Sequence, residues 1–154
     1  MKSSKLLKII RNELKDYPID YLRNKVTDER YKDPLVKKLA KYNSQTYDEI
    51  YSVEIKDDFD VKDEVIKKMK ADINYYFDTY AGGDVETREF TKYISLYLAL
   101  IAKKPLHPYS DDKKDDVYEF DNSYYCKIRM KAIHDKRSLC RYCVCQNVGY
   151  MGLF

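Results

Sequence analysis

The 154-residue sequence has no tryptophan and only four glycines and four prolines. An all-β sandwich or barrel needs many tight turns, so this shortage of turn-forming residues argues against such a fold. Long apolar runs are lacking too. The richest stretch, YISLYLALIA at 93–102, is shorter than the roughly 18 residues of a membrane span. We therefore expect a protein that does not enter a membrane.

The motifs of several enzyme classes are missing as well. The chain has no glycine-rich loop followed by Lys and Ser or Thr, which P-loop enzymes use to bind phosphates. No serine stands in the G-x-S-x-G context of a hydrolase nucleophile. Residues 1–17 lack the apolar core and the small-residue cleavage site of a signal peptide, so we expect a cytoplasmic protein.

What the chain does contain is 44% hydrophobic and 36% charged residues, a balance typical of a soluble globular protein. Its length allows one domain with a hydrophobic core, so we expect 1–154 to form a single domain. Over 1–105, apolar residues recur every three or four positions, which indicates amphipathic helices.

Local signals place the first three helices. We expect one to begin at Ser3 or Ser4, acting as its N-cap, and a second to follow Pro18. A third is expected after Asp33, which precedes a proline suited to a first helical turn. The predicted buried stripe of this third helix is Leu35, Leu39 and Tyr42.

Two longer helices are predicted at the centre of the core. One extends from Asp58 or Asp60 to Tyr80, and the other follows Asp84, as N-cap, and reaches Ile101. Because the link between them is short, we expect these two helices to form an antiparallel hairpin.

The composition changes after the helices. The stretch SDDKKDD, 110–116, is typical of a charged surface loop, and all four cysteines lie beyond it. There, VYEF and YYCKIRM are expected as short strands or irregular extended pieces. The predicted fold is mainly α: a bundle of about five helices over 1–105, with an irregular cysteine-rich C-terminal segment, 117–154, packed on it.

The cysteines point most directly to chemistry. Three lie within SLCRYCVCQN, 138–147, and the fourth lies upstream, so the set is Cys126, Cys140, Cys143 and Cys145. Two residues between Cys140 and Cys143 allow a tight turn to aim both sulfurs at one ion, and Cys126 closes the site from a second segment. Structural zinc takes four tetrahedral N or S ligands. We therefore predict zinc as the cofactor.

Two histidines are alternative ligands. Only one residue separates Cys143 from Cys145, which makes it hard for both to serve one ion without strain. The substitute fourth ligand is then His134 or His107. His134 lies inside 126–145, which we call the cysteine segment, and His107 lies in the proline-flanked KPLHPY loop.

Other interpretations of the cysteines stay open. Four cysteines also hold iron–sulfur clusters, although this spacing differs from the ferredoxin patterns. Cys140 or Cys143 is a candidate thiolate of a redox protein or enzyme, with His107 nearby. Free cysteines also occur simply as small buried apolar residues.

Positive charge is concentrated around these cysteines. Over 126–145 six basic residues accompany one acidic residue, a local net charge of +5 in a chain whose total is +3. Such charge offsets that of a zinc–thiolate centre and also suits nucleic acid or another anionic partner. A solvated basic face without a partner is the commoner case. The basic patch consists of Lys127, Arg129, Lys131, Lys136, Arg137 and Arg141.

Two segments carry a resemblance to a known family: KPLHP after an aromatic-rich amphipathic helix, and YYCK with SLCRYCVC near the C-terminus. From about Phe90 onward the chain resembles small proteins of methanogenic archaea that are known as a domain of unknown function. The resemblance implies a cytoplasmic protein of a strict anaerobe, in which metal–thiolate and iron–sulfur sites survive easily. It implies no activity and no catalytic residues.

Taken together, these features predict first a metal-stabilised binding or interaction protein that contains zinc. The alternatives are a thiol-dependent redox protein or enzyme, which uses Cys140 or Cys143, and a nucleic-acid-binding protein, which uses the basic patch. The sequence leaves open whether the protein is an enzyme, what its ligand is and whether it forms oligomers.

Overall fold

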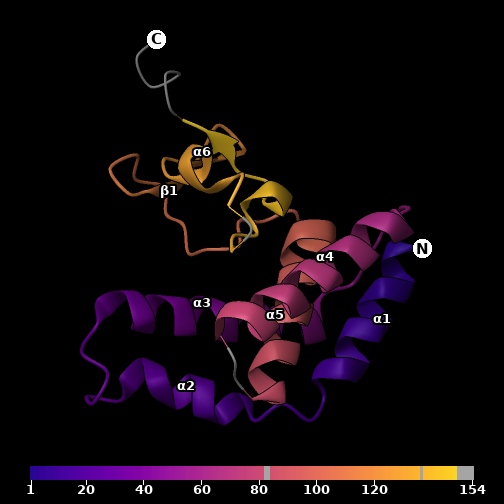
Figure 1. Ribbon diagram of the computed structural model, residues 1–154, viewed down its shortest axis with the longest axis horizontal. Coiled ribbons are helices and arrows are strands. Elements are labelled where there is room, and N and C mark those ends of the chain that lie inside the picture. The colour runs from indigo at the N-terminus through magenta and orange to yellow at the C-terminus, as the bar shows by residue number, and fades with distance from the viewer. Residues whose placement is uncertain (82–83, 136, 149–154) are drawn as a thin grey trace.

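The computed structural model describes residues 1–81, 84–135 and 137–148 (Figure 1). Its α-helices are α1 (Ser3–Leu14), α2 (Ile19–Thr27), α3 (Pro34–Ser52), α4 (Asp63–Tyr76), α5 (Val85–Leu96) and α6 (Arg129–Ala132). Two π-helical turns, η1 (Phe77–Ala81) and η2 (Tyr97–Ala102), continue α4 and α5, and η3 (Cys140–Tyr142) is a 3-10 turn. The strands are β1 (Val117–Phe120), β2 (Ser123–Cys126) and β3 (Gln146–Asn147).

The mainly helical class is confirmed, with five α-helices in the part of 1–105 that the structure describes. Figure 1 shows α1, α4 and α5 side by side, whereas α2 and α3 form a pair that extends to one side of them. The structure thus shows a helical core with a protruding helix pair. In the helices described, none is long and apolar enough to span a membrane.

The start of α1 is held by a distant residue and not by its own serines. The Asp58 carboxylate accepts hydrogen bonds from the Ser4 backbone N–H at 2.9 Å and from the Ser3 and Ser4 hydroxyls at 2.7 Å each. The bonds from Ser4 and then that from Ser3 lower the pKa of Asp58 to about 2. Asp58 therefore caps α1 across 54 positions of sequence, and the prediction that Ser3 or Ser4 caps this helix was wrong.

The same contact explains why α4 begins at Asp63, later than predicted from Asp58 or Asp60. Asp58 is engaged at α1, and Asp60 forms a β-bridge with Lys2, so this stretch is extended. The expected cap of α3 is confirmed, because the Asp33 carboxylate accepts from the Leu35 backbone N–H at 2.9 Å.

The predicted stripe of α3 is only partly buried. Leu35 is 73% exposed and Leu39 39% exposed, while Tyr42 is half-buried. The first turns of α3 extend past the core and contact mainly α2, so little of the molecule covers them (Figure 1). Farther along α3, Ile50 is fully buried.

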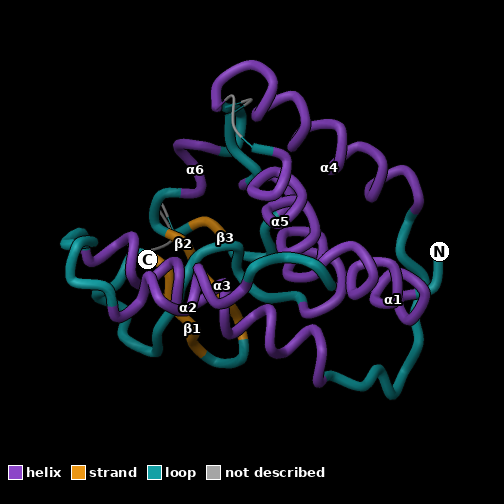
Figure 2. Tube along the Cα trace, turned by 90° about the horizontal axis from the view of Figure 1, so that it is seen from below, coloured by secondary structure: helices purple, strands orange, loops and turns teal. Residues whose placement is uncertain are grey.

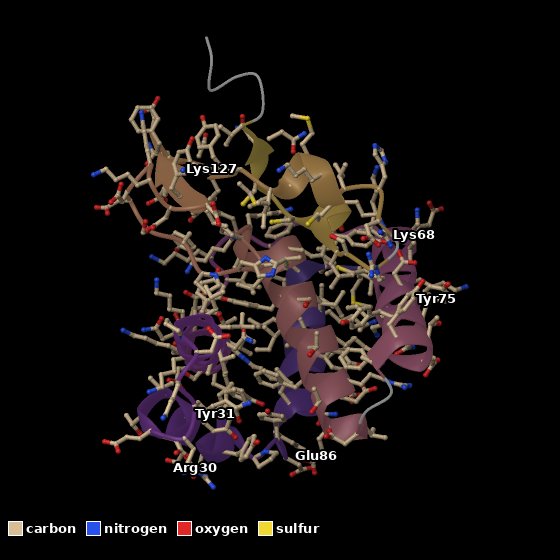
Figure 3. All side chains as sticks on the ribbon, turned by 60° about the vertical axis from the view of Figure 1, so that its left-hand side comes forward. Arg30, Tyr31, Lys68, Tyr75, Glu86 and Lys127 are labelled. Carbon is tan, nitrogen blue, oxygen red and sulfur yellow. The ribbon has the colours of Figure 1, made fainter. Side chains whose placement is uncertain are left out.

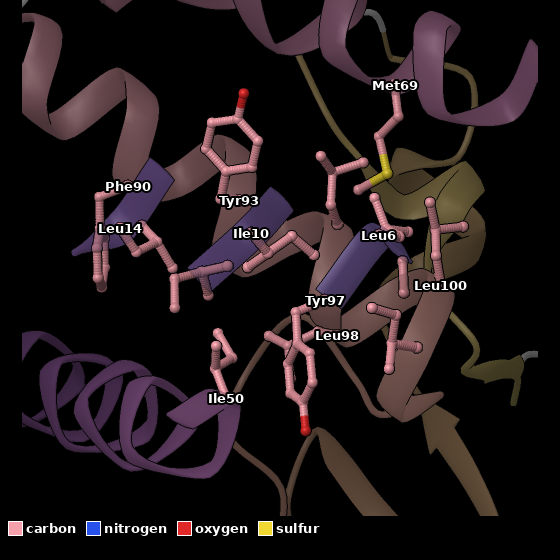
Figure 4. Packing of buried hydrophobic residues seen from close by; sticks show 14 of the residues in the cluster. Leu6, Ile10, Leu14, Ile50, Met69, Phe90, Tyr93, Tyr97, Leu98 and Leu100 are labelled. Atoms are coloured by element: carbon pink, nitrogen blue, oxygen red, sulfur yellow. The ribbon is translucent and has the colours of Figure 1, made fainter. Parts of the chain in front are cut away.

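The core lies where α1, α4 and α5 meet. Figure 4 shows Leu6, Ile10 and Leu14 along one face of α1, opposite Phe90 and other residues of α5. The i, i+4 spacing of these α1 residues puts them in one apolar row. All three are at most 1% exposed.

The described part of the C-terminal segment contains only short elements, in keeping with the predicted irregular segment. Short strands were one of the two expected possibilities: VYEF forms β1, and the start of YYCKIRM lies in β2. β1 pairs antiparallel with β2 through the turn at Asp121 and Asn122. Both turn residues have positive φ, which Asp and Asn tolerate better than most residues. β3 then adds in parallel to β2, and Figure 2 shows β2 and β3 near α6.

The buried row of α1 generates a test of the core. Ile10 is 0% exposed. The variant Ile10→Ala should lower the free energy of unfolding by about 2–5 kcal/mol, because it leaves a cavity in the core. The control Leu35→Ala, at 73% exposure, should change it by less than about 0.5 kcal/mol. Urea denaturation measures both, and equal losses in the two variants would show that α1 does not pack as described.

Candidate functional site

The register of a very short strand pair brings the two halves of the cysteine set together. β3 pairs with β2 so that Tyr125 faces Gln146 and Cys126 faces Asn147. Cys145 directly precedes β3, so the parallel register places it opposite Tyr124 of β2. Cys126 and Cys145 are 7% and 4% exposed and share a small apolar cluster with Val117.

The other two cysteines lie at the two ends of one tight turn. In η3 the Cys143 backbone N–H donates to the Cys140 carbonyl at 3.2 Å, and the Cys140 backbone N–H donates to the Ser138 hydroxyl at 3.0 Å. Arg129 of α6 secures this turn: its Nε donates to the Cys140 carbonyl at 3.1 Å and its Nη1 to Asn147 Oδ1 at 3.0 Å. One guanidinium thus joins α6, η3 and β3.

Cys143 and Cys145 face each other. The backbone at Cys143 is extended, with φ −72° and ψ 141°, and in extended chain residues two apart lie on the same side. A hydrogen bond between the two sulfurs lowers the pKa of the Cys143 thiol to about 6 and raises that of Cys145, which burial raises further. The two side chains thus lie on the same side of the chain, and the expected strain, which concerns both cysteines serving one metal ion, stays a prediction.

Backbone N–H groups point at two of the sulfurs. At Cys126, burial raises the pKa of the thiol, while N–H groups of Ile128 and Arg129 act in the opposite direction. Cys143 accepts from the N–H of Cys145 and from that of Leu106. Such N–H donors at positions two and three after a cysteine stabilise a thiolate more than a neutral thiol.

The KPLHP loop comes to the cysteines from the end of the core helix. Besides the Leu106 N–H, the charge of His107 contributes to the lowered pKa of Cys143. The Tyr42 hydroxyl donates to the Pro105 carbonyl and so fixes this loop against α3. Of the two predicted substitute ligands, His107 therefore lies near the cysteines. His134 is exposed in the turn after α6.

All four cysteines are free thiols, and Cys126 has both Cys140 and Cys143 close enough to influence its pKa. Figure 3 shows sulfur atoms gathered in the C-terminal part of the molecule, not far from Lys127. Among the residues that the structure describes, no group of three or more His, Cys, Asp or Glu side chains is arranged so that it could hold a metal ion. The thiols are neighbours without forming a preassembled metal cage.

Much of the basic patch is used inside the fold. Arg129 holds the η3 turn, Arg137 pairs with Asp135 at 3.0 Å, and Arg141 pairs with Asp72 at 2.6 Å. Lys127 donates to the Lys114 carbonyl at 3.0 Å. Lys131 is exposed, and Lys136 lies outside the described residues. The charge available to an anionic partner is therefore smaller than the count of basic residues indicates.

An anchor on α4, which the sequence did not predict, holds the cysteine segment to the helices. The Asp72 carboxylate accepts from Arg141 at 2.6 Å and from the Tyr142 hydroxyl, and both donors stand between Cys140 and Cys143. Burial opposes ionisation of Asp72, but these two hydrogen bonds, with that from Arg141 the stronger, lower its pKa below the usual 3.8. No local pattern could have revealed this contact, because it spans 70 positions.

Comparison with known proteins now identifies the family. Residues 2–148 match the family described as uncharacterized proteins conserved in archaea (DUF2115). The chain belongs to this family. It is also 29% identical over 163 residues to UPF0305 protein MJ0646 of Methanocaldococcus jannaschii, covering 96% of this chain and 98% of that protein.

The family match confirms the resemblance to proteins of methanogenic archaea and extends it from the region after Phe90 to almost the whole described chain. No solved structure matches this chain. The family description supplies no activity, so the function has to be argued from the site.

The anchor generates a prediction about the cysteine segment. Asp72→Asn should lower the free energy of unfolding by about 1–2 kcal/mol, because it weakens two hydrogen bonds to a charged group at a site about a quarter exposed. It should also speed amide hydrogen exchange in 140–143. Because the pKa of Asp72 is lowered in the fold, its stabilising contribution is present above about pH 3.8 and is lost as the pH falls below that value.

Asp48→Asn is the matched control. Asp48 pairs with Arg23 at the same 2.6 Å, but it is 60% exposed and lies on the helix pair α2–α3. Asp48→Asn should lower the free energy of unfolding by less than about 0.5 kcal/mol and leave amide hydrogen exchange in 140–143 unchanged. If both variants behaved alike, Asp72 would not be an anchor.

Proposed function

We propose that the protein is a zinc-stabilised binding protein in which Cys126, Cys140, Cys143 and Cys145 hold the metal. The observation that supports this most is the proximity of free thiols from two separate chain segments: Cys126, Cys143 and Cys145 share one apolar cluster, and backbone N–H groups act on the sulfurs of Cys126 and Cys143. Four thiolates are a donor set that suits zinc.

The protonation of one donor supports zinc directly. Metal ligation requires thiolates, and pairing with Cys145 lowers the pKa of the Cys143 thiol to about 6. The thiols of Cys126 and Cys145, whose pKa values are raised in the fold, would release their protons on binding the metal. Arg129 and Arg141 lie within the same segment and offset the negative charge of four thiolates. His107 is the substitute ligand that the structure keeps nearby.

Binding would need the thiols to close together further, since the described thiols do not form a metal cage as they stand. η3 and β3 are short elements, so a local movement toward Cys126 that keeps the Asp72 anchor would break few hydrogen bonds. When bound, a zinc ion in such a site acts structurally: it cross-links β2, η3 and the start of β3.

Metal analysis tests this proposal. Protein purified without chelator or oxidant should contain about one zinc per chain, and Cys126→Ser or Cys143→Ser should reduce zinc affinity by more than the about 10- to 100-fold typical of an outer-shell change. The control Val144→Ala alters the same segment without removing a thiol and should retain the metal.

Zinc and iron both far below one equivalent in the unaltered protein would overturn the proposal. A brown protein with visible absorbance and near-stoichiometric iron would replace zinc by an iron–sulfur cluster. Full zinc retention in both serine variants would show that the metal lies elsewhere.

A second candidate function is thiol chemistry at Cys143, and one observation favours it. Cys143 is half-buried, hydrogen-bonded to Cys145 and to the Leu106 N–H, and close to His107 at the surface. A nucleophilic thiolate needs such N–H donors and a neighbouring histidine. In this interpretation Cys143 is the nucleophile and His107 the proton carrier.

Alkylation distinguishes the second candidate from the first. In metal-free, folded protein at pH 7, iodoacetamide should modify Cys143 at least about tenfold faster than Cys126, whose burial raises the pKa of its thiol. His107→Gln should slow the reaction at Cys143, whereas the exposed His134→Gln should not. Uniformly slow alkylation of all four thiols would exclude this function.

A further inference from the structure

A cavity lies between the helices and the cysteine segment. Its volume is about 390 Å³, within the range of small-molecule sites. The walls come from α3, from the facing sides of α4 and α5, from the loop at 106–107, and from 137–139, which precedes η3. It is formed by segments far apart in the sequence, as ligand sites commonly are.

Most of the wall is apolar. The apolar residues include Ile73 and Phe77 from α4 and η1, Phe90 and Leu98 from α5 and η2, and Leu139 from the cysteine segment. Phe77 and Leu98 both belong to the π-helical turns that end the two core helices. Such π turns are often found at functional sites, and here two of them border one cavity.

The polar groups of the wall are uncharged or basic. Asn43, Thr91, Ser95 and Ser138 supply an amide and three hydroxyls, His107 supplies an imidazole, and Arg137 supplies a positively charged guanidinium. None of the described lining residues is acidic. An anionic group therefore meets no like charge from the wall, whereas a cation has no carboxylate there to pair with.

Arg137 keeps one guanidinium nitrogen outside its ion pair with Asp135. Its backbone N–H, Nε and Nη2 all bond to the Asp135 carboxylate, at 2.9, 3.2 and 3.0 Å, which leaves Nη1 outside this pair. The guanidinium also lies near Tyr80 and near Tyr76, which lines the cavity. A fixed guanidinium at the edge of an apolar space suits a carboxylate, sulfonate or phosphate on an apolar body.

We propose that this cavity binds a small amphipathic molecule with an apolar body and an anionic end, the body between α4 and α5 and the anionic end toward Arg137 and His107. This inference goes beyond the metal site and does not depend on it, because Asp72, through Arg141 and Tyr142, already holds the cysteine segment against α4 without metal.

Two dyes of matched shape test the proposal. The probe is 1-anilinonaphthalene-8-sulfonate, and the comparison is N-phenyl-1-naphthylamine, which has the same rings without the sulfonate. Fluorescence titration of the full chain, with its zinc content measured beforehand, should show saturable binding of one sulfonate dye per chain. Near-UV circular dichroism of the tyrosines confirms that the protein stays folded, since this dye also binds partly unfolded states.

Variants locate the binding. Thr91→Phe fills the cavity from a half-buried position and should lower the affinity for both dyes by about tenfold or more. Thr27→Phe, at an exposed position at the end of α2, should leave both affinities unchanged. Leu39→Asp puts a carboxylate into the wall. Because the position is 39% exposed, the variant should still fold. It should lower the affinity for the sulfonate dye more than the affinity for the neutral dye.

Arg137→Gln isolates the anionic end. This variant should lower the affinity for the sulfonate dye by about two- to fivefold and leave the affinity for the neutral dye unchanged. Arg30→Gln is the matched control, because Arg30 pairs with Asp28 through the same three groups and Figure 3 shows it at the end of the molecule away from Lys127.

Three results would overturn the proposal: no saturable binding of the sulfonate dye, binding that survives both Thr91→Phe and Leu39→Asp, or equal weakening of both dyes by Arg137→Gln. If protein purified without metal binds one sulfonate dye per chain, the result supports the proposed cavity site. The missing metal would then count only against the zinc site.

Discussion

The burial of one stretch of chain on all sides is the constraint on which the rest of the structure depends. Residues 92–101, the second half of α5 and most of η2, are all buried. The residues of this stretch are mostly apolar, with Lys92 and Ser95 as the buried polar exceptions, and a helix with apolar side chains around its circumference has to be enclosed. Thus α1 and α4 pack on α5, and α3 also contacts it (Figures 1 and 4). The buried Tyr97 hydroxyl is satisfied by donating to Glu49 of α3, which also pairs with Lys104.

The end of this stretch also positions the candidate site. At Lys103 the chain takes a left-handed conformation, φ 56°, and leaves the helix. Pro105, which is buried, and Leu106 follow, so the Leu106 N–H reaches the Cys143 sulfur as a consequence of where the core helix stops. Asp72 on α4 fixes the other side of the same turn through Arg141. The cysteine segment, which has little core of its own, thus takes its position from the helices.

The sequence predicted what depends on local pattern and missed what depends on distant contacts. Periodicity and the Asp33 cap placed the helices, and Cys spacing predicted that Cys126 would meet the C-terminal cysteines. The cap at Asp58 and the anchor at Asp72 act across 54 and 70 positions, and no periodic signal marks them. β3 has two residues, too few for an alternating pattern, so its pairing with β2 could not be predicted either. Leu35 is exposed because periodicity identifies an apolar face but not whether anything covers it.

The cysteine centre and the cavity share walls, and this makes them one physical system. Leu106 donates its N–H to Cys143 while its side chain lines the cavity, and Ser138 accepts from the Cys140 N–H while it lines the cavity too. If the thiols close around an ion as proposed, both residues would move, because each bonds directly to the turn that holds Cys140 and Cys143. A change of cavity shape on metal binding would then require, by thermodynamic linkage, that a molecule in the cavity changes metal affinity by the same factor. Leu106 and Ser138 are the residues through which the cysteine centre and the cavity would be coupled in this fold.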